Sequence, residues 1–158
     1  LEYYLDNFPE DPLILWALAQ NYIYLREYDL ARVELDRAMT LLPIWYFVFT
    51  GGDIHFYQGD LVAAEKEYRK LLEVPEQSAQ IVGIERLAAI YTLQGRFDKT
   101  VEQFKQAIGL AENIGEVQWI TTDLLRLAEI YLETGNPENA LEELEKAWEI
   151  RKKICRTM

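Results

Sequence analysis

The sequence predicts an all-α fold made of antiparallel helix pairs that stack one after another. Two sets of small residues recur along the chain, and each member of the first set is followed 12 residues later by its counterpart in the second. The first set is Ala19, Gly52, Ala88 and Ala128, and the second set is Ala31, Ala64, Thr100 and Ala140. The constant distance indicates a repeating unit of fixed geometry, with length variation confined to the joints between units.

Each unit is predicted to contain two amphipathic helices. In the first unit, apolar residues recur at helical spacing on two successive segments, Leu15, Leu18, Ala19 and Tyr22 on one, Leu30, Leu35 and Ala38 on the other. Glycine separates the two helices in the later units, at Gly59-Asp60, Gly95-Arg96 and Gly135-Asn136-Pro137. Glycine tolerates the left-handed backbone that ends a helix, and Pro after Asn is typical of a helix start. No segment alternates with period two for long enough to predict a strand.

The repeats are expected to organise the whole chain, 1–158, as a single domain. The predicted boundaries are 12–43, 44–76, 77–114 and 115–158 for four complete repeats, preceded by a partial repeat over 1–11. The partial repeat resembles the end of a second helix whose first helix is missing.

These residues resemble the signature of the tetratricopeptide repeat, which places an apolar or aromatic residue, Leu-Gly or Leu-Ala and a Tyr before later Ala, aromatic and Pro positions. The first repeat matches it at Leu15, Leu18, Ala19, Tyr22, Ala31, Leu35, Ala38 and Pro43, and the fourth at Leu124, Leu127, Ala128, Tyr131, Ala140, Leu144 and Ala147. The resemblance covers nearly the whole chain. It implies a right-handed superhelix, or α-solenoid, that binds other proteins.

The second repeat departs from the signature. Gly51 stands where Leu is usual and His55 where Tyr is usual, so this repeat is expected to pack more loosely than the others. Residues 110–116 resemble the joints of longer-period relatives in bacterial signalling and regulatory proteins, so a larger protein of that kind is the expected source.

Charge and composition narrow the class of partner. The formal net charge is −11 and the pI is about 4.6, so the surface repels phosphate backbones, and we expect neither nucleic acid nor an anionic membrane as a partner. A protein or peptide with apolar and basic character fits better. The longest apolar run, 41–49, is far shorter than the roughly 18 residues that span a bilayer. The single cysteine, Cys155, excludes an internal disulfide and suits a reducing compartment, so we expect a cytoplasmic protein.

The candidate binding groove follows the first helix of each repeat. Residues at three- and four-residue spacing that do not point at the partner helix are expected to line it. In the first half of the chain these are aromatic or apolar for the most part: Leu13, Trp16, Gln20, Tyr24, Tyr46, Phe49, Asp53 and Tyr57. In the second half they are mixed and net acidic: Glu85, Arg86, Glu129 and Glu133. The stripe therefore predicts a partner segment with an apolar end and a basic end.

A structural role is the alternative. The segment 44–57 is apolar nearly all round, and such a helix is usually buried, here by neighbouring repeats, by ordinary core or by a partner in a homodimer. A subset of tetratricopeptide repeats grips a C-terminal carboxylate with basic and amide side chains. The matching positions here are Gln20, Asp53, Ala89 and Glu129, with Glu85 in place of a lysine, which argues against that mode.

Catalytic chemistry finds little support in the sequence. The one histidine, His55, and the one cysteine are a hundred residues apart, and His55 occupies a position expected to pack between helices. No zinc, calcium or phosphate-loop motif appears, so we predict no metal, no cofactor and no enzymatic activity. The carboxylates near the start of the last helix suit the positive end of its dipole.

Overall fold

The computed structural model describes residues 10–157, with side chains as far as Cys155. Most of the predicted partial repeat over 1–11 lies outside the described residues. The chain divides into two compact units, Leu1–Val74 (unit 1) and Pro75–Met158 (unit 2), and each is described by itself.

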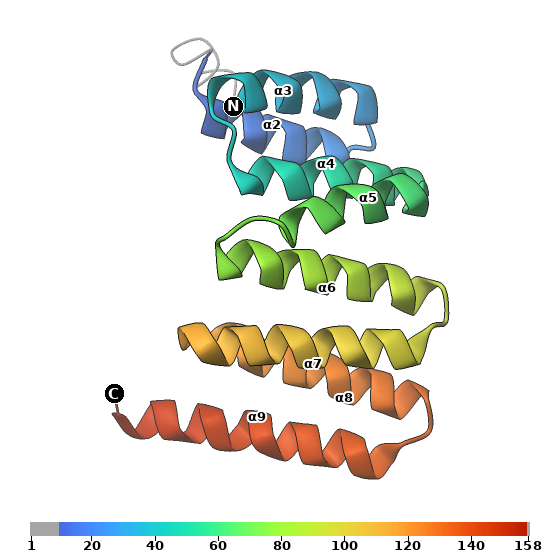
Figure 1. Ribbon diagram of the computed structural model, residues 1–158, viewed down its shortest axis with the longest axis vertical. Coiled ribbons are helices and arrows are strands. Elements are labelled where there is room, and N and C mark those ends of the chain that lie inside the picture. The colour runs from blue at the N-terminus through green and yellow to red at the C-terminus, as the bar shows by residue number, and fades with distance from the viewer. Residues whose placement is uncertain (1–9, 158) are drawn as a thin grey trace. The chain divides into compact units, whose positions relative to one another are not determined.

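Unit 1 contains two consecutive helix pairs (Figure 1). Its helices are α2 (Pro12–Tyr24), α3 (Tyr28–Leu41), α4 (Trp45–Gln58) and α5 (Leu61–Leu71). Helix α2 packs on α3 and α4 packs on α5, while α4 also contacts α2 and α3. The described part of unit 1 has no strand.

Unit 2 has the same organisation with longer helices (Figure 1). Its helices are α6 (Gln77–Leu93), α7 (Phe97–Ile114), α8 (Val117–Glu133) and α9 (Pro137–Thr157). Helix α6 packs on α7, α7 on α8, and α8 on α9. Every predicted complete repeat therefore contains one helix pair, and the all-α prediction is confirmed for residues 10–157.

The turns inside the four helix pairs share one backbone geometry. The seventh residue after each small residue of the first set has a positive φ: 63° at Arg26, 84° at Gly59, 68° at Gly95 and 74° at Gly135. Glycine adopts this left-handed conformation without the steric cost that a side chain brings. The first repeat therefore makes the same turn as the others with an arginine at the strained position.

Close helix approach explains why the recurring residues are small. All eight members of the two sets are buried. The tightest approach is at Gly52 on α4, where an added Cβ would lie 2.6 Å from Tyr68 Cδ1 of α5. Tyr68 itself has no exposed surface. The second repeat is therefore tightly packed at this position, because the glycine lets the fully buried tyrosine ring lie directly against the helix backbone.

No helix within residues 10–157 combines the length and the apolar character needed to cross a membrane.

Candidate functional site

Unit 1 carries a cluster of aromatic rings that we call the aromatic patch: Trp16 of α2 and Trp45, Tyr46 and Phe49 of α4. The Trp45 and Tyr46 rings stack with centroids 3.9 Å apart. Trp16 meets the Tyr46 ring edge-on at 6.2 Å, and Phe49 lies 6.2 Å from both Trp45 and Tyr46. Tyr46 is 46% exposed and the other three side chains are half-buried. The patch is thus one continuous aromatic surface built from two neighbouring repeats.

A buried threonine holds this surface in place. The Thr50 hydroxyl accepts hydrogen bonds from Trp16 Nε1 at 2.8 Å and from Gln20 Nε2 at 3.0 Å. The same hydroxyl donates to the Tyr46 carbonyl oxygen at 3.0 Å. Because Trp16 already uses its N–H inside the protein, the surface it offers is apolar. Fixed side chains lose less freedom on binding, so the patch is organised before a partner arrives.

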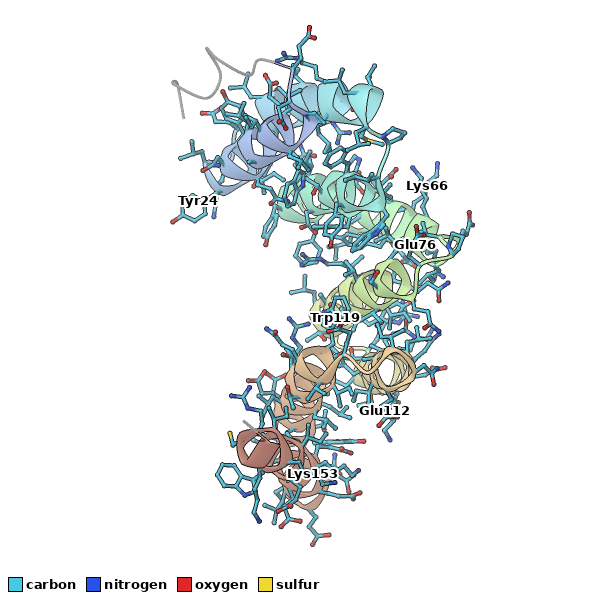
Figure 2. All side chains as sticks on the ribbon, turned by 90° about the vertical axis from the view of Figure 1, so that its left-hand side faces the viewer. Tyr24, Lys66, Glu76, Glu112, Trp119 and Lys153 are labelled. Carbon is cyan, nitrogen blue, oxygen red and sulfur yellow. The ribbon has the colours of Figure 1, made fainter. Side chains whose placement is uncertain are left out.

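The other predicted groove residues of unit 1 have different environments. Leu13, Tyr24 and Tyr57 are exposed, and Tyr24, at 88%, points away from the helices (Figure 2). Gln20 is half-buried beside Thr50. Asp53 is only 5% exposed and accepts a 2.6 Å hydrogen bond from the Tyr68 hydroxyl, so it belongs to the core and not to an open groove. Helical spacing predicted Asp53 on the same stripe as Phe49 and Tyr57. Its carboxylate instead lies in the core, where it accepts the hydrogen bond from Tyr68 of α5.

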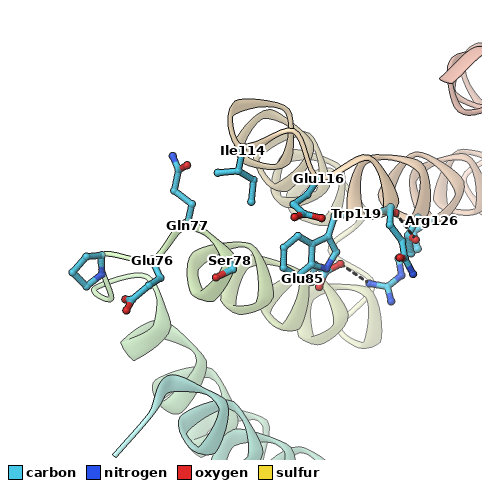
Figure 3. Close-up of a pocket in the computed structure, with 11 residues that line it drawn as sticks. Glu76, Gln77, Ser78, Glu85, Ile114, Glu116, Trp119 and Arg126 are labelled. Carbon is cyan, nitrogen blue, oxygen red and sulfur yellow. Dashed lines mark hydrogen bonds and ion pairs between the residues drawn. The ribbon is translucent and has the colours of Figure 1, made fainter. Parts of the chain in front are cut away.

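Unit 2 contains an open pocket of about 1140 Å³ between α6 and the start of α8 (Figure 3). The residues that we call the acidic pocket are Glu76, Glu85, Glu116, Trp119 and Arg126. The Glu85 side chain is 14% exposed and accepts a 3.3 Å hydrogen bond from Arg126 Nη1. Four residues of unit 2 were predicted to line the groove, and Glu85 is the one that lines this pocket.

The remaining predicted residues of unit 2 lie elsewhere on α6 and α8. Arg86 is half-buried, and Glu129 and Glu133 are exposed further along α8. None of the three is among the residues that line the acidic pocket.

Asp123 of α8 is a charged residue that sequence reasoning missed. It has no exposed surface, and neither carboxyl oxygen receives a hydrogen bond from a donor in the described part of the chain. Its nearest cation is Arg126, whose Nη1 lies 3.9 Å from Asp123 Oδ1. Burial, and then the neighbouring Glu85 carboxylate, raise the pKa of Asp123 to about 8, although Arg126 opposes the shift. At neutral pH the Asp123 carboxyl is therefore mostly protonated, and its own proton can complete a hydrogen bond to Glu85.

The repeat pattern holds a signal that could have identified Asp123. It lies five residues before its small first-set residue, where the other repeats have Ile14, Phe47 and Gly83. An acid at a position that is apolar or glycine in every other repeat is expected to be buried, and a buried acid needs a special environment.

The face between α8 and α9 is also partly open. A second pocket of about 900 Å³ is lined by Leu125, Leu144 and Trp148, among others, and Trp148 is 67% exposed. Leu144, which matches the repeat signature, is 39% exposed.

The residues considered for catalysis are dispersed. His55 is half-buried and its Nε2 lies 3.2 Å from Arg32 Nη2 of α3, while Cys155 is exposed near the end of α9. In the described part of the chain, no three His, Cys, Asp or Glu side chains gather where they could hold a metal ion.

Comparison with known proteins finds one family model, described as tetratricopeptide repeat, which matches residues 80–153. No curated protein sequence matches.

Several solved structures share the fold at low sequence identity. The crystal structure of MamA is 17% identical, with a TM-score of 0.67, and the match covers 98% of this chain and 86% of that one. BtubC (BKLC) from P. vanneervenii is 16% identical, with a TM-score of 0.73, covering 91% of this chain and 66% of that one. PilF of Pseudomonas aeruginosa is 17% identical, with a TM-score of 0.69, covering 89% and 61%. At these identities the likeness concerns the fold.

Proposed function

Because this chain is built of tetratricopeptide repeats, which serve in protein–protein interaction and as scaffolds, we propose that its aromatic patch binds an apolar segment of a partner protein. The observation that carries the proposal is the patch itself, with four aromatic side chains from two repeats in mutual contact and Tyr46 nearly half exposed. Exposed apolar patches of this kind usually mark binding sites on soluble proteins.

The energies are sufficient for a useful complex. Burial of a large apolar side chain contributes roughly 1.5–3 kcal/mol. A micromolar complex needs about 8 kcal/mol net. Three or four anchors from the partner therefore suffice even after ordering costs, particularly because Thr50 already holds Trp16 and Gln20 in place.

The proposed partner is a helix or an extended segment with apolar anchors and some basic residues. The net charge of −11 favours a basic protein segment over nucleic acid or an anionic lipid surface. The single cysteine supports a cytoplasmic setting for this interaction.

A peptide library screened against the intact chain tests the proposal. We expect selected apolar peptides to bind the Tyr46→Ala and Phe49→Ala variants at least about tenfold more weakly, which corresponds to one lost anchor. The matched control is Tyr24→Ala, which removes an 88% exposed tyrosine outside the patch and should leave affinity unchanged. Helicity and thermal unfolding of each variant must match those of the unchanged chain. Peptides that bind all four proteins equally would contradict a role for the patch.

Self-association is the second candidate function, and the exposed Trp148 with its apolar neighbours on α8 and α9 favours it. Light scattering over a concentration series separates the two. A dimer that dissociates on dilution and is lost in Trp148→Glu or Tyr46→Glu would identify the apolar surface as a contact between copies. A monomer at every concentration would leave the aromatic patch free for another protein.

A further inference from the structure

We propose that the acidic pocket of unit 2 binds an arginine side chain of a partner protein. This inference rests on the proposed interaction function and adds the chemistry that the partner must carry. It concerns unit 2 alone, whereas the aromatic patch belongs to unit 1.

The charge of the pocket favours a cation. Three carboxylates, those of Glu76, Glu85 and Glu116, and one guanidinium, that of Arg126, line the pocket. Arg126 reaches Glu85 at 3.3 Å, whereas Glu76 and Glu116 have no ion-pair partner among the described residues. The pocket therefore carries a net negative charge, and its open space is large enough for a long side chain.

Trp119 makes a guanidinium the best match. Its half-buried indole lines the same pocket as Glu85, as the close-up shows (Figure 3). A guanidinium can stack on an indole face while its edge donates two hydrogen bonds to a carboxylate. A lysine ammonium is a more strongly hydrated point charge and cannot do both with the same group.

Asp123 adds a buried acidic group whose charge depends on what binds nearby. Its carboxyl is completely buried, lies beside Glu85 and Arg126, which line the pocket, and receives no hydrogen bond from a donor among the described residues. Buried polar atoms in native proteins are nearly always paired, so the Asp123 carboxyl needs either a hydrogen-bond donor or its own proton. A cation bound at Glu85 would favour the ionised form of Asp123.

The groups that act on Asp123 come from two helices. They are Glu85 of α6 and Arg126 of α8 itself. Charged side chains of α7 and α9, including Lys105, Glu143 and Lys146, line a separate pocket with Ile120 and Leu124 of α8. Arginine binding should therefore tighten as the pH rises toward about 8, because the pKa of Asp123 lies there and its ionisation adds a negative charge.

A pair of peptides tests the proposal directly. The probe is a short capped peptide with one arginine among glycines, and its twin carries citrulline, which has nearly the same shape without the charge. Binding is followed through the indole N–H signal of Trp119 in nitrogen-15 spectra of the full chain, assigned with the Trp119→Phe variant. We expect the arginine peptide to shift this signal saturably, with affinity about tenfold or more above that of the citrulline peptide.

Four variants sharpen the result. Glu85→Gln should weaken the arginine peptide about tenfold, whereas Glu129→Gln, which removes an exposed carboxylate of α8 outside the pocket, should change little. Arg126→Gln should strengthen binding, because it removes the cation that competes for Glu85. Asp123→Asn should abolish the rise in affinity with pH.

The proposal is overturned if both peptides bind alike, if neither moves the Trp119 signal, or if Glu129→Gln weakens binding as much as Glu85→Gln. The last result would mean attraction to the overall negative surface only. Failure here is distinguishable from failure of the proposed function, because apolar peptides that depend on Tyr46 report on unit 1. Their binding should be unchanged by Glu85→Gln.

Discussion

Units 1 and 2 each bury an aspartate on the first helix of their second pair, and the two side chains have opposite surroundings. Asp53 of α4 accepts a 2.6 Å hydrogen bond from the hydroxyl of Tyr68, which is itself completely buried. Asp123 of α8 has no donor within the residues that the structure describes, lies against a second carboxylate, Glu85, and has a pKa raised to about 8. Burial alone thus does not decide what a carboxyl group does, because the groups from the next helix determine whether it is stabilised.

This difference separates a structural acid from one that costs stability. The Asp53–Tyr68 bond ties α4 to α5 beside the close approach at Gly52. Asp123 is an acid at a position where the other repeats have an apolar residue or glycine. Residues that break a repeat's pattern in this way tend to lie at functional sites. Unit 1 therefore offers an apolar patch on a well-satisfied core, and unit 2 offers an acidic pocket in which Glu85 lies beside a poorly satisfied carboxyl.

The largest expected effect comes from Asp123→Asn and depends on pH. In the folded chain the pKa of Asp123 is about 8, against an ordinary 3.8, so between these values the folded state holds a proton that the unfolded chain has released. Stability should fall as the pH rises through this window, by at most about 1.4 kcal/mol per pH unit. Asp123→Asn removes this slope, so the variant should be the more stable protein near pH 8. Urea unfolding followed by circular dichroism at several pH values measures both slopes.

The control for this experiment is Glu129→Gln, which removes an exposed carboxylate from the same helix. Its stability profile should run parallel to that of the unchanged chain. Equal slopes for the unchanged chain and Asp123→Asn would show that Asp123 is ionised in the folded state throughout the window.

Tyr68→Phe brings Asp53 closer to the state of Asp123 by removing one of its hydrogen-bond donors. We expect a loss of about 1–3 kcal/mol in the free energy of unfolding, because the ring still fills its site while a buried carboxyl loses a hydrogen bond. Hydrogen exchange measured by mass spectrometry should show faster exchange in α4 and α5, with α8 and α9 unchanged. A neutral effect would mean that Asp53 is satisfied by its other surroundings.

The smallest expected effects come from the two adjacent glycines of α4. Gly52→Ala should destabilise unit 1 by about 1–2 kcal/mol, because the new methyl group meets the rigid Tyr68 ring and the gain in helix propensity offsets only part of this. Gly51→Ala is the matched control. Its Cβ would lie 3.7 Å from Leu35 Cδ2, an ordinary contact, so this variant should gain up to about 1 kcal/mol. Thermal unfolding that shifts in the same direction for both variants would contradict the packing described at Gly52.

Much of the fold could be predicted because its signals are local and repeated. The two sets of small residues mark close helix contacts, and all eight are buried. Of the four positive-φ turns inside the helix pairs, three coincide with predicted glycines. The fourth, at Arg26, could not be predicted in this way because arginine does not favour a positive φ. Of the aromatic patch, Trp16, Tyr46 and Phe49 were predicted as surface residues of one stripe, and they do lie together.

The sequence by itself determined the helices, their order and their pairing, because a period of 3.6 residues and a glycine at a turn act over a few residues. Only the tertiary structure decided which acids are buried and what they meet. Asp53 and Glu85 were both predicted to line the groove, yet Asp53 accepts a hydrogen bond from Tyr68 in the core, whereas Glu85 borders a pocket and interacts with Asp123. That outcome depends on side chains from another helix, 15 residues away for Asp53 and 38 away for Glu85, and no local pattern encodes their distance.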